Sequence, residues 1–227
     1  MPRATDGPRR ERVLVLFDAT AARSHDEALA DYVDAVVRGL GAELVVACRP
    51  DDAEHYRRLA PGAAIEAGPV ALRWRGIRML WRQFALPRIA RRHDVDVVHS
   101  PWPPVPLFVA RPRVVTVHSM RAFDHESPRR PGDALRRAAV RTAVRAADEI
   151  MTLHRDIAES LESALGFSAG DVLVAPVAAD LDRFAAAHRL AYRAAAALVP
   201  AETGPISLPR QQDLPLAVDG NEPTVAH

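Results

Sequence analysis

The 227-residue chain contains no lysine, and arginine supplies all 30 of its basic residues. Together with the abundance of alanine, this bias indicates a GC-rich coding sequence, and we assign it no function. The 29 acidic residues leave a net charge of only +1, so no broad positive field favours a nucleic-acid partner. The composition is otherwise that of an ordinary globular protein, long enough to bury the core of one large α/β domain.

A single cysteine, Cys48, excludes an internal disulfide and a cysteine-based zinc site. It lies in an apolar run, which predicts a buried structural thiol rather than a nucleophile. Long apolar runs are also absent. Residues 1–12 are polar, and the apolar stretch 13–17 that follows is too short for a signal sequence or a membrane span. We therefore expect a cytoplasmic protein.

The sequence also lacks the motifs of three common classes of α/β enzyme. It contains no G-x-G-x-x-G turn for a dinucleotide, no Walker A loop and no G-x-S-x-G nucleophile elbow. These absences disfavour a dehydrogenase, a P-loop NTPase and an α/β-hydrolase. The histidines His93, His99, His118 and His125 do not have compact metal-ligand spacing, so we expect no metal site.

Short β-branched runs alternate with amphipathic helical patterns from residue 12 to about residue 184. Continuous apolar strands that alternate with helices are typical of βαβ units. The pattern predicts an α/β fold with a doubly wound, mostly parallel, Rossmann-like sheet of about seven strands. The expected strands are 13–17, 44–48, 64–70, 95–99, 114–118, 150–153 and 172–175.

Helix signals fill the intervals between these strands. Ser24 and Glu27 form a capping box at the start of the first helix, and Gly41 predicts its end. Pro87 is expected to interrupt the third helix, and Gly166 to end a later one. The expected helices are 24–40, 51–59, 74–86, 133–147 and 157–165.

These signals divide the chain into four parts. We expect a flexible N-terminus at 1–11, a Rossmann-like domain at 12–184, an alanine-rich helix at 185–199 and a disordered tail at 200–227. The tail is rich in proline and has few large apolar residues with which to form a core.

Three histidines lie at the ends of expected strands, where open parallel sheets bind their ligands. They are His99, His118 and His154. A single histidine at such a position commonly has a structural role, with its ring bonded to a backbone carbonyl. Because several gather on one edge, we expect at least one of them to be functional.

Four of the strand-end segments resemble motifs of family 4 glycosyltransferases of the GT-B fold. Asp96–His99 reads D-V-V-H, and Val114–His118 reads V-V-T-V-H. Arg145–Leu153 is similar to the family's helix-then-strand segment A-D-x-I-x-x-x-S. Val172–Pro176, continuing to Asp180–Phe184, resembles the exit from the first domain, V-x-V-I-P-N-G-V-D-x-x-R-F. In this order and spacing, the motifs resemble the N-terminal, acceptor-side domain of the family.

The resemblance implies retaining, metal-independent transfer of a sugar from a nucleotide sugar to an acceptor, with no further cofactor. The first domain would hold a sugar or lipid-linked acceptor, and the second the nucleotide diphosphate and donor sugar. His118 matches the family histidine beside the donor sugar, where an imidazole can bond a hydroxyl or the developing charge. It is our candidate catalytic residue. The strand-end loops supply the candidate substrate-binding residues Arg23, Ser24, His99, Ser119 and Arg121.

The sequence departs from the family pattern in several places. Residues 19–23 replace a Gly-rich turn, although Arg23 and the helix start at Ser24 can attract an anion. The family's H-D is His118-Ser119, its N-G is replaced at 177–179, and nothing after residue 184 resembles the second domain. We expect the isolated chain to be inactive and to require a separate donor-binding domain or subunit. The alternative is a non-catalytic remnant that acts as a binding or scaffold module.

The segment 73–92 contains seven arginines and no acidic residue. On a helical projection Ile77, Leu80, Trp81 and Phe84 share one face, which we expect to pack on the sheet, with the arginines opposite. The simplest interpretation is a solvated basic face. The alternative is peripheral attachment to an anionic membrane at its inner face, and nucleic-acid binding ranks third. The candidate membrane contacts are Arg75, Arg78 and Arg82.

Overall fold

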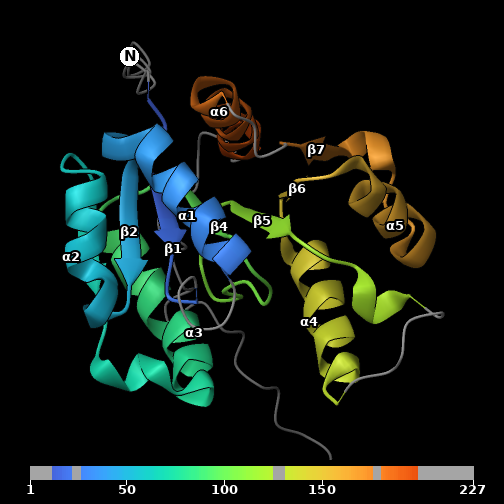
Figure 1. Ribbon diagram of the computed structural model, residues 1–227, viewed down its shortest axis with the longest axis horizontal. Coiled ribbons are helices and arrows are strands. Elements are labelled where there is room, and N and C mark those ends of the chain that lie inside the picture. The colour runs from blue at the N-terminus through green and yellow to red at the C-terminus, as the bar shows by residue number, and fades with distance from the viewer. Residues whose placement is uncertain (1–11, 22–26, 125–130, 176–179, 199–227) are drawn as a thin grey trace, which may run out of the picture.

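The computed structural model describes residues 12–21, 27–124, 131–175 and 180–198, and its centre is a parallel β-sheet (Figure 1). The seven strands are all parallel and lie in the order β3-β2-β1-β4-β5-β6-β7. This confirms the predicted fold class. The strands are β1 Val15–Asp18, β2 Leu44–Cys48, β3 Ala64–Ala67, β4 Val97–Ser100, β5 Arg113–Val117, β6 Glu149–Thr152 and β7 Val172–Val174.

Helices cover both faces of the sheet. They are α1 Glu27–Leu40, α2 Pro50–Leu59, α3 Arg75–Arg92, α4 Asp133–Ala146, α5 Arg155–Leu165 and α6 Leu181–Ala197. One core cluster joins one face of the sheet to α1, α2 and α6, and two others join the opposite face to α3 and to α4 with α5. The strand order reverses between β1 and β4, so the carboxyl ends of these two strands form the switch point at which such sheets bind ligands.

Single-turn 3₁₀ helices complete the connections. They are η1 Gly41–Glu43, η2 Val70–Arg73, η3 Arg121–Phe123 and η4 Ala169–Asp171. Gly41 and Gly166 end α1 and α5 with positive φ angles of 48° and 75°, as the sequence predicted, because glycine has no Cβ to oppose this conformation. Cys48 is fully buried, as the sequence predicted, and burial raises the pKa of its thiol to about 12.

Helix α6 completes the cover of the sheet. It begins at Leu181, four residues before the alanine-rich segment, where the Asp180 side chain caps the amides of Asp182 and Arg183. It packs on α1 and across β4, β5, β6 and β7. A Cβ added to Gly39 on α1 would lie 3.1 Å from the Cβ of Ala185, so small residues permit the close approach of these two helices. The chain's own helices therefore cover both faces of the sheet.

Two features of α3 differ from the sequence prediction. The expected interruption at Pro87 is wrong, because the helix continues through it to Arg92. A mid-helix proline costs about 3 kcal/mol, and the continuation buries Ile89 and Ala90 against the sheet, which offsets that cost. The helix is also rotated about its axis relative to the expected orientation, as described below.

The Ser24 capping box and the segments 1–11 and 200–227 lie outside the described residues.

Candidate functional site

His118 follows β5 at the carboxyl edge of the sheet and is half-buried. Its Nε2 lies 2.8 Å from the carbonyl oxygen of Pro101, and because a carbonyl can only accept, the imidazole donates this bond. The ring of Trp102 stacks on it at 5.9 Å between centroids, and Tyr32 meets it edge-on at 4.8 Å. These contacts come from α1 and from the loop after β4, and they fix the orientation of the ring.

This geometry also decides the chemistry that His118 can perform. Since Nε2 carries the hydrogen, Nδ1 is the acceptor nitrogen of the neutral ring. The ring can accept a hydrogen bond from a hydroxyl group, or carry a positive charge next to a developing anion when it is protonated. His118 therefore combines the structural carbonyl bond common at strand ends with a partly exposed position on the rim.

Ser119 and Arg121 lie beside His118 in the same loop. Ser119 is exposed, and its hydroxyl accepts a 3.2 Å hydrogen bond from the backbone amide of Arg121. The Arg121 guanidinium donates to Asp133 at 3.1 Å, and this carboxylate, at the start of α4, is almost fully buried. The ion pair holds the loop against α4. The substrate-binding roles of both residues stay predictions.

His99 occupies a different environment although it is on the neighbouring strand, β4. Its side chain is fully buried, and both ring nitrogens are bonded inside the protein. In this structure it presents no surface to an acceptor, so its burial argues for a packing role rather than the expected substrate contact. It belongs to a buried polar network made of Tyr32, His99, Thr116, His188 and Tyr192.

The hydrogen bonds of this buried polar network form one chain, in which each group donates to the next. The Phe184 carbonyl accepts from Nδ1 of His188 at 2.9 Å, so Nε2 of neutral His188 accepts from the Tyr32 hydroxyl at 2.9 Å. The Tyr32 oxygen then accepts from the Thr116 hydroxyl at 2.9 Å. The Thr116 oxygen in turn accepts from Nε2 of His99 at 2.9 Å.

The last bond of the network leads to α6. Nδ1 of His99 accepts from the Tyr192 hydroxyl at 2.7 Å. When both imidazoles are neutral, each hydroxyl and each ring N–H of the network donates one hydrogen bond, so these buried groups are satisfied. Burial lowers the pKa of His99 well below its usual value, lowers the pKa of His188 to about 4, and raises that of Tyr192. The network therefore fastens α6 to the sheet without buried charge.

The expected solvated positions of Arg78 and Arg82 are wrong. Both side chains are buried, with 8% and 5% of their surface exposed, and Arg82 forms an ion pair with Asp18 at the end of β1. The Arg82 guanidinium also donates to the Trp102 carbonyl at 3.0 Å. Asp18 in turn accepts bonds from the amide and hydroxyl of Thr20 at 3.1 and 2.6 Å.

Asp18 explains the rotation of α3. A carboxylate without a nearby cation is costly in the interior, and Arg82 is the cation that the rotation brings to it. Asp18 was visible in the sequence as an acidic residue directly after a continuous apolar strand, but no role was predicted for it. The ion pair also secures the backbone of Trp102, whose ring stacks on His118.

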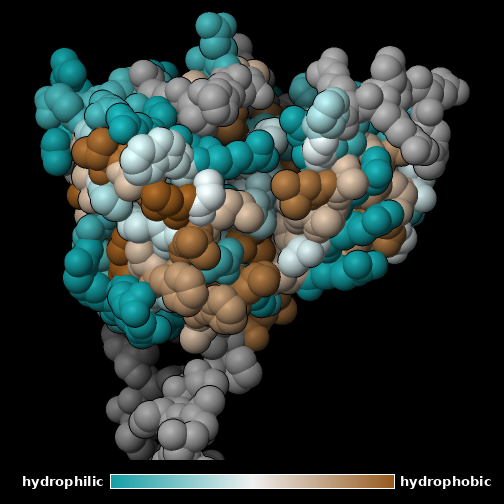
Figure 2. Space-filling model, turned by 90° about the horizontal axis from the view of Figure 1, so that it is seen from below, coloured by the Kyte–Doolittle hydropathy of each residue, from teal (hydrophilic) through white to brown (hydrophobic). Residues whose placement is uncertain are grey.

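The rotation places apolar side chains of α3 in solvent. The outward apolar face consists of Trp74, Ile77, Leu80, Phe84 and Phe108, which are 40–66% exposed. Phe84 stacks on Phe108 of the loop after β4, at 6.1 Å between centroids. Arg75 is exposed as expected, and the guanidinium of Arg73 lies 4.7 Å from the centre of the Trp74 ring. Figure 2 shows hydrophobic surface gathered on this lower side of the molecule.

Three further results concern the remaining expectations. Arg23 and Ser24 lie outside the described residues. Within the part of the chain that the structure describes, no group of three or more histidine, cysteine or acidic side chains could hold a metal ion. Over the same ranges, no helix combines the length and the apolar character that a membrane-spanning segment requires.

The chain matches the model of a known protein family. The family model described as Glycosyltransferase Family 4 matches residues 29–183, which is more than half of the chain. The match runs from α1 to the start of α6 and includes the rim with His118 and the Asp18 partner Arg82. No curated protein is detectably similar to the chain. A seven-stranded parallel sheet with this family match shows that the chain belongs to glycosyltransferase family 4.

Proposed function

We propose that this chain is the acceptor-side half of a glycosyltransferase, which transfers a sugar from a nucleotide sugar once a donor-binding domain completes it. The observation that carries the proposal is the setting of His118. A half-exposed imidazole stands at the carboxyl edge of a parallel sheet, and three contacts hold its ring in one orientation. Such a fixed ring can bond a sugar hydroxyl without losing rotamer entropy on binding.

The need for a second half follows from electrostatics. Sugar transfer releases a nucleoside diphosphate, whose growing charge must be neutralised in a cleft that excludes water. Two arginines at this part of the rim are already paired with carboxylates of the chain itself: Arg82 with Asp18 and Arg121 with Asp133. A separate donor-binding domain or subunit would supply the missing positive groups and close over His118.

The test is a reconstituted transfer assay. The chain is mixed with a separately produced donor-binding chain and a lipid extract, and release of UDP or GDP is followed from UDP-glucose, UDP-N-acetylglucosamine and GDP-mannose. We expect His118→Ala to reduce kcat by about 10²-fold or more, as loss of a positioned hydrogen-bonding group does. The matched control is His55→Ala, because His55 pairs with Asp34 at 2.8 Å on the outer helices. Equal activity of the two variants would refute the role of His118.

The outward apolar face of α3 favours a second function, which is attachment to a membrane. We propose that this face rests on an anionic membrane, so that a lipid-linked acceptor reaches the rim. Arg73 and Arg75 are exposed beside the apolar side chains, and this pairing of apolar and basic groups suits the interface of an anionic bilayer. Arg78 and Arg82 take no part in it, because both are buried.

The face is also continuous with the rim. Gln83 of α3 donates to the carbonyl of Val105 at 3.0 Å and accepts from the amide of Leu107 at 2.7 Å. These two bonds join α3 to the loop after β4, the same loop whose Trp102 stacks on His118. A lipid held at the outward apolar face therefore lies next to the loop that shapes the candidate site.

The membrane proposal is tested by sedimentation with vesicles of phosphatidylglycerol and phosphatidylcholine. Leu80→Ser should weaken binding to the anionic vesicles, by about fivefold to tenfold for the lost apolar contact. Leu190→Ser is the matched control, because Leu80 and Leu190 are 62% and 60% exposed and Leu190 lies on α6, across the sheet. Two results would contradict the proposal. One is vesicle binding that is the same for Leu80→Ser, Leu190→Ser and the unaltered chain, and the other is no binding to anionic vesicles.

A further inference from the structure

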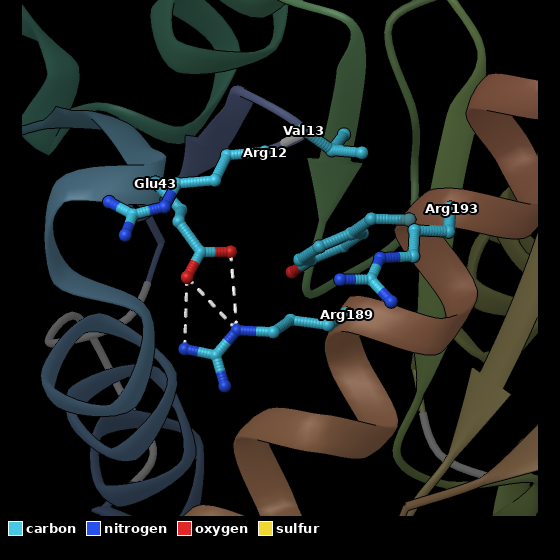
Figure 3. A pocket seen from close by; sticks show the side chains of 6 residues that line it. Arg12, Val13, Glu43, Arg189 and Arg193 are labelled. Atoms are coloured by element: carbon cyan, nitrogen blue, oxygen red, sulfur yellow. Dashed lines mark hydrogen bonds and ion pairs between the residues drawn. The ribbon is translucent and has the colours of Figure 1, made fainter. Parts of the chain in front are cut away.

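A cavity lies at the end of the sheet opposite to His118. It has a volume of about 230 Å³ and is lined by Arg12, Val13, Glu43, Arg189, Tyr192 and Arg193. Arg12 and Val13 precede β1, Glu43 directly precedes β2, and the remaining lining residues belong to α6. Figure 3 shows that segments far apart in the sequence bring these side chains together. At about 30 Å³ for each water molecule, the cavity has room for a small ligand.

One of the three arginines is held in place by the protein itself. The Nε of Arg189 lies 2.9 and 3.2 Å from the two carboxylate oxygens of Glu43, and an Nη lies 2.9 Å from one of them. The same guanidinium donates to the Gly39 carbonyl at 3.2 Å. Arg189 and Glu43 thus form a fixed wall of the cavity, which Figure 3 shows with dashed lines.

The other two arginines leave the cavity positive. Among the described residues, neither Arg12 nor Arg193 forms an ion pair. Three guanidiniums and one carboxylate line the cavity, so the net charge of the lining is 3 − 1 = +2. A phosphate group carries about −1.5 to −2 charges at pH 7, and guanidinium groups match its oxygen atoms with paired, charge-assisted hydrogen bonds.

We propose that this cavity is a second ligand site, which binds a phosphate group, either free phosphate or that of a small phosphorylated molecule. Val13 and the ring of Tyr192 give it an apolar wall against which the carbon skeleton of an organic phosphate can pack. The Tyr192 hydroxyl is bonded to His99. A bound phosphate therefore braces α6 at the point where the buried polar network fastens that helix to the sheet.

The test uses the full chain, with inorganic phosphate and glycerol 3-phosphate as probes and sodium chloride at matched ionic strength as the reference. Titration calorimetry gives the affinity, and thermal unfolding gives the stabilisation, which rises with ligand concentration if the folded state binds it. We expect both phosphates, but not chloride alone, to raise the unfolding temperature. Tighter binding of glycerol 3-phosphate would identify an organic ligand, and equal binding would identify free phosphate.

Variants locate the binding. The double substitution Arg12→Gln and Arg193→Gln should weaken phosphate binding by about tenfold or more, because charge-assisted hydrogen bonds are lost. Both side chains are exposed, so their replacement leaves the core intact, and the unfolding temperature without ligand verifies this. Arg155→Gln is the control, because Arg155 is 83% exposed on α5. Equal phosphate affinity of the double variant and the control would overturn the proposal, and so would stabilisation no greater than that by chloride.

Discussion

Replacement of Arg82 by methionine should destabilise the protein strongly, although Arg82 is one of seven arginines in a polar-looking segment. The Arg82 and Asp18 side chains are 5% and 1% exposed. The substitution keeps an unbranched stem but leaves a buried carboxylate without its cation, and it removes the donor to the Trp102 carbonyl. Breaking a buried ion pair by removing one partner costs about 3–5 kcal/mol.

The cost is measurable by urea unfolding followed by tryptophan fluorescence. Trp74, Trp81 and Trp102, the three tryptophans of the chain, lie in or beside α3 and the loop that Arg82 contacts. We expect a lower urea midpoint with an unchanged m-value, and a fall of about 6–20 °C in melting temperature for a domain of this size.

Two further variants make this prediction refutable. Arg75→Met alters an exposed arginine on the same helix and should change the free energy of unfolding by less than about 0.5 kcal/mol. The double variant Asp18→Asn with Arg82→Met has no unpaired buried charge, and should recover part of the loss. If Arg82→Met were no more destabilising than Arg75→Met, the account of the rotated helix would be refuted.

The buried polar network and the sheet cover supply further predictions. The folded-state pKa of His188, about 4, lies below the unfolded value of about 6.5, so protons bind preferentially to the unfolded chain. The contribution of neutral His188 to the free energy of unfolding is therefore present above the unfolded pKa, and it falls by about 2 kcal/mol between pH 7 and pH 5. In urea titrations at the two pH values, His188→Gln should reduce this fall, whereas an unchanged slope would argue against it. Tyr32→Phe removes the acceptor of the Thr116 hydroxyl hydrogen and the donor to Nε2 of His188 and should cost about 1–3 kcal/mol; a cost near zero by the same titration would show that these two bonds contribute no stability. Gly39→Ala brings a methyl group to within 3.1 Å of Ala185 and should lower the melting temperature; no change would mean that α1 and α6 separate at little cost.

The sheet was predictable from local pattern. The strands and most helix ends follow from continuous apolar runs and from glycines such as Gly41 and Gly166, whose positive φ angles are local properties of the backbone. Pro87 was misjudged because its local penalty is outweighed by the burial of Ile89 and Ala90, which depends on the tertiary structure.

The orientation of α3 was not predictable from its own periodicity. Ile77, Leu80 and Phe84 mark an apolar face that normally packs inward, but the decisive interaction is with Asp18, 64 residues away from Arg82 in the sequence. Pattern analysis of one helix contains no information about that carboxylate. The exposed apolar face and the buried arginines are two consequences of this one pairing.

The candidate site was predictable only in part. Position at the carboxyl edge of the sheet and family motifs led to His118, but the same reasoning chose His99, whose burial depends on α6. Helix α6 follows the last strand by sequence, and its docking over β4 could not be read from an alanine-rich pattern. Trp102 was visible as a residue after a strand, whereas its stacking on His118 required the fold.

The central proposal is that this family 4 chain provides the acceptor side of a glycosyltransferase and requires a donor-binding domain for transfer. The most direct measurement is the rate of UDP or GDP release from nucleotide sugars by the purified chain, with and without a separately produced donor-binding chain, in the presence of acceptor lipid. The account predicts background release by the chain alone and turnover that depends on His118 when both are present. Rapid turnover by the chain alone, or a complete system indifferent to His118→Ala, would contradict it.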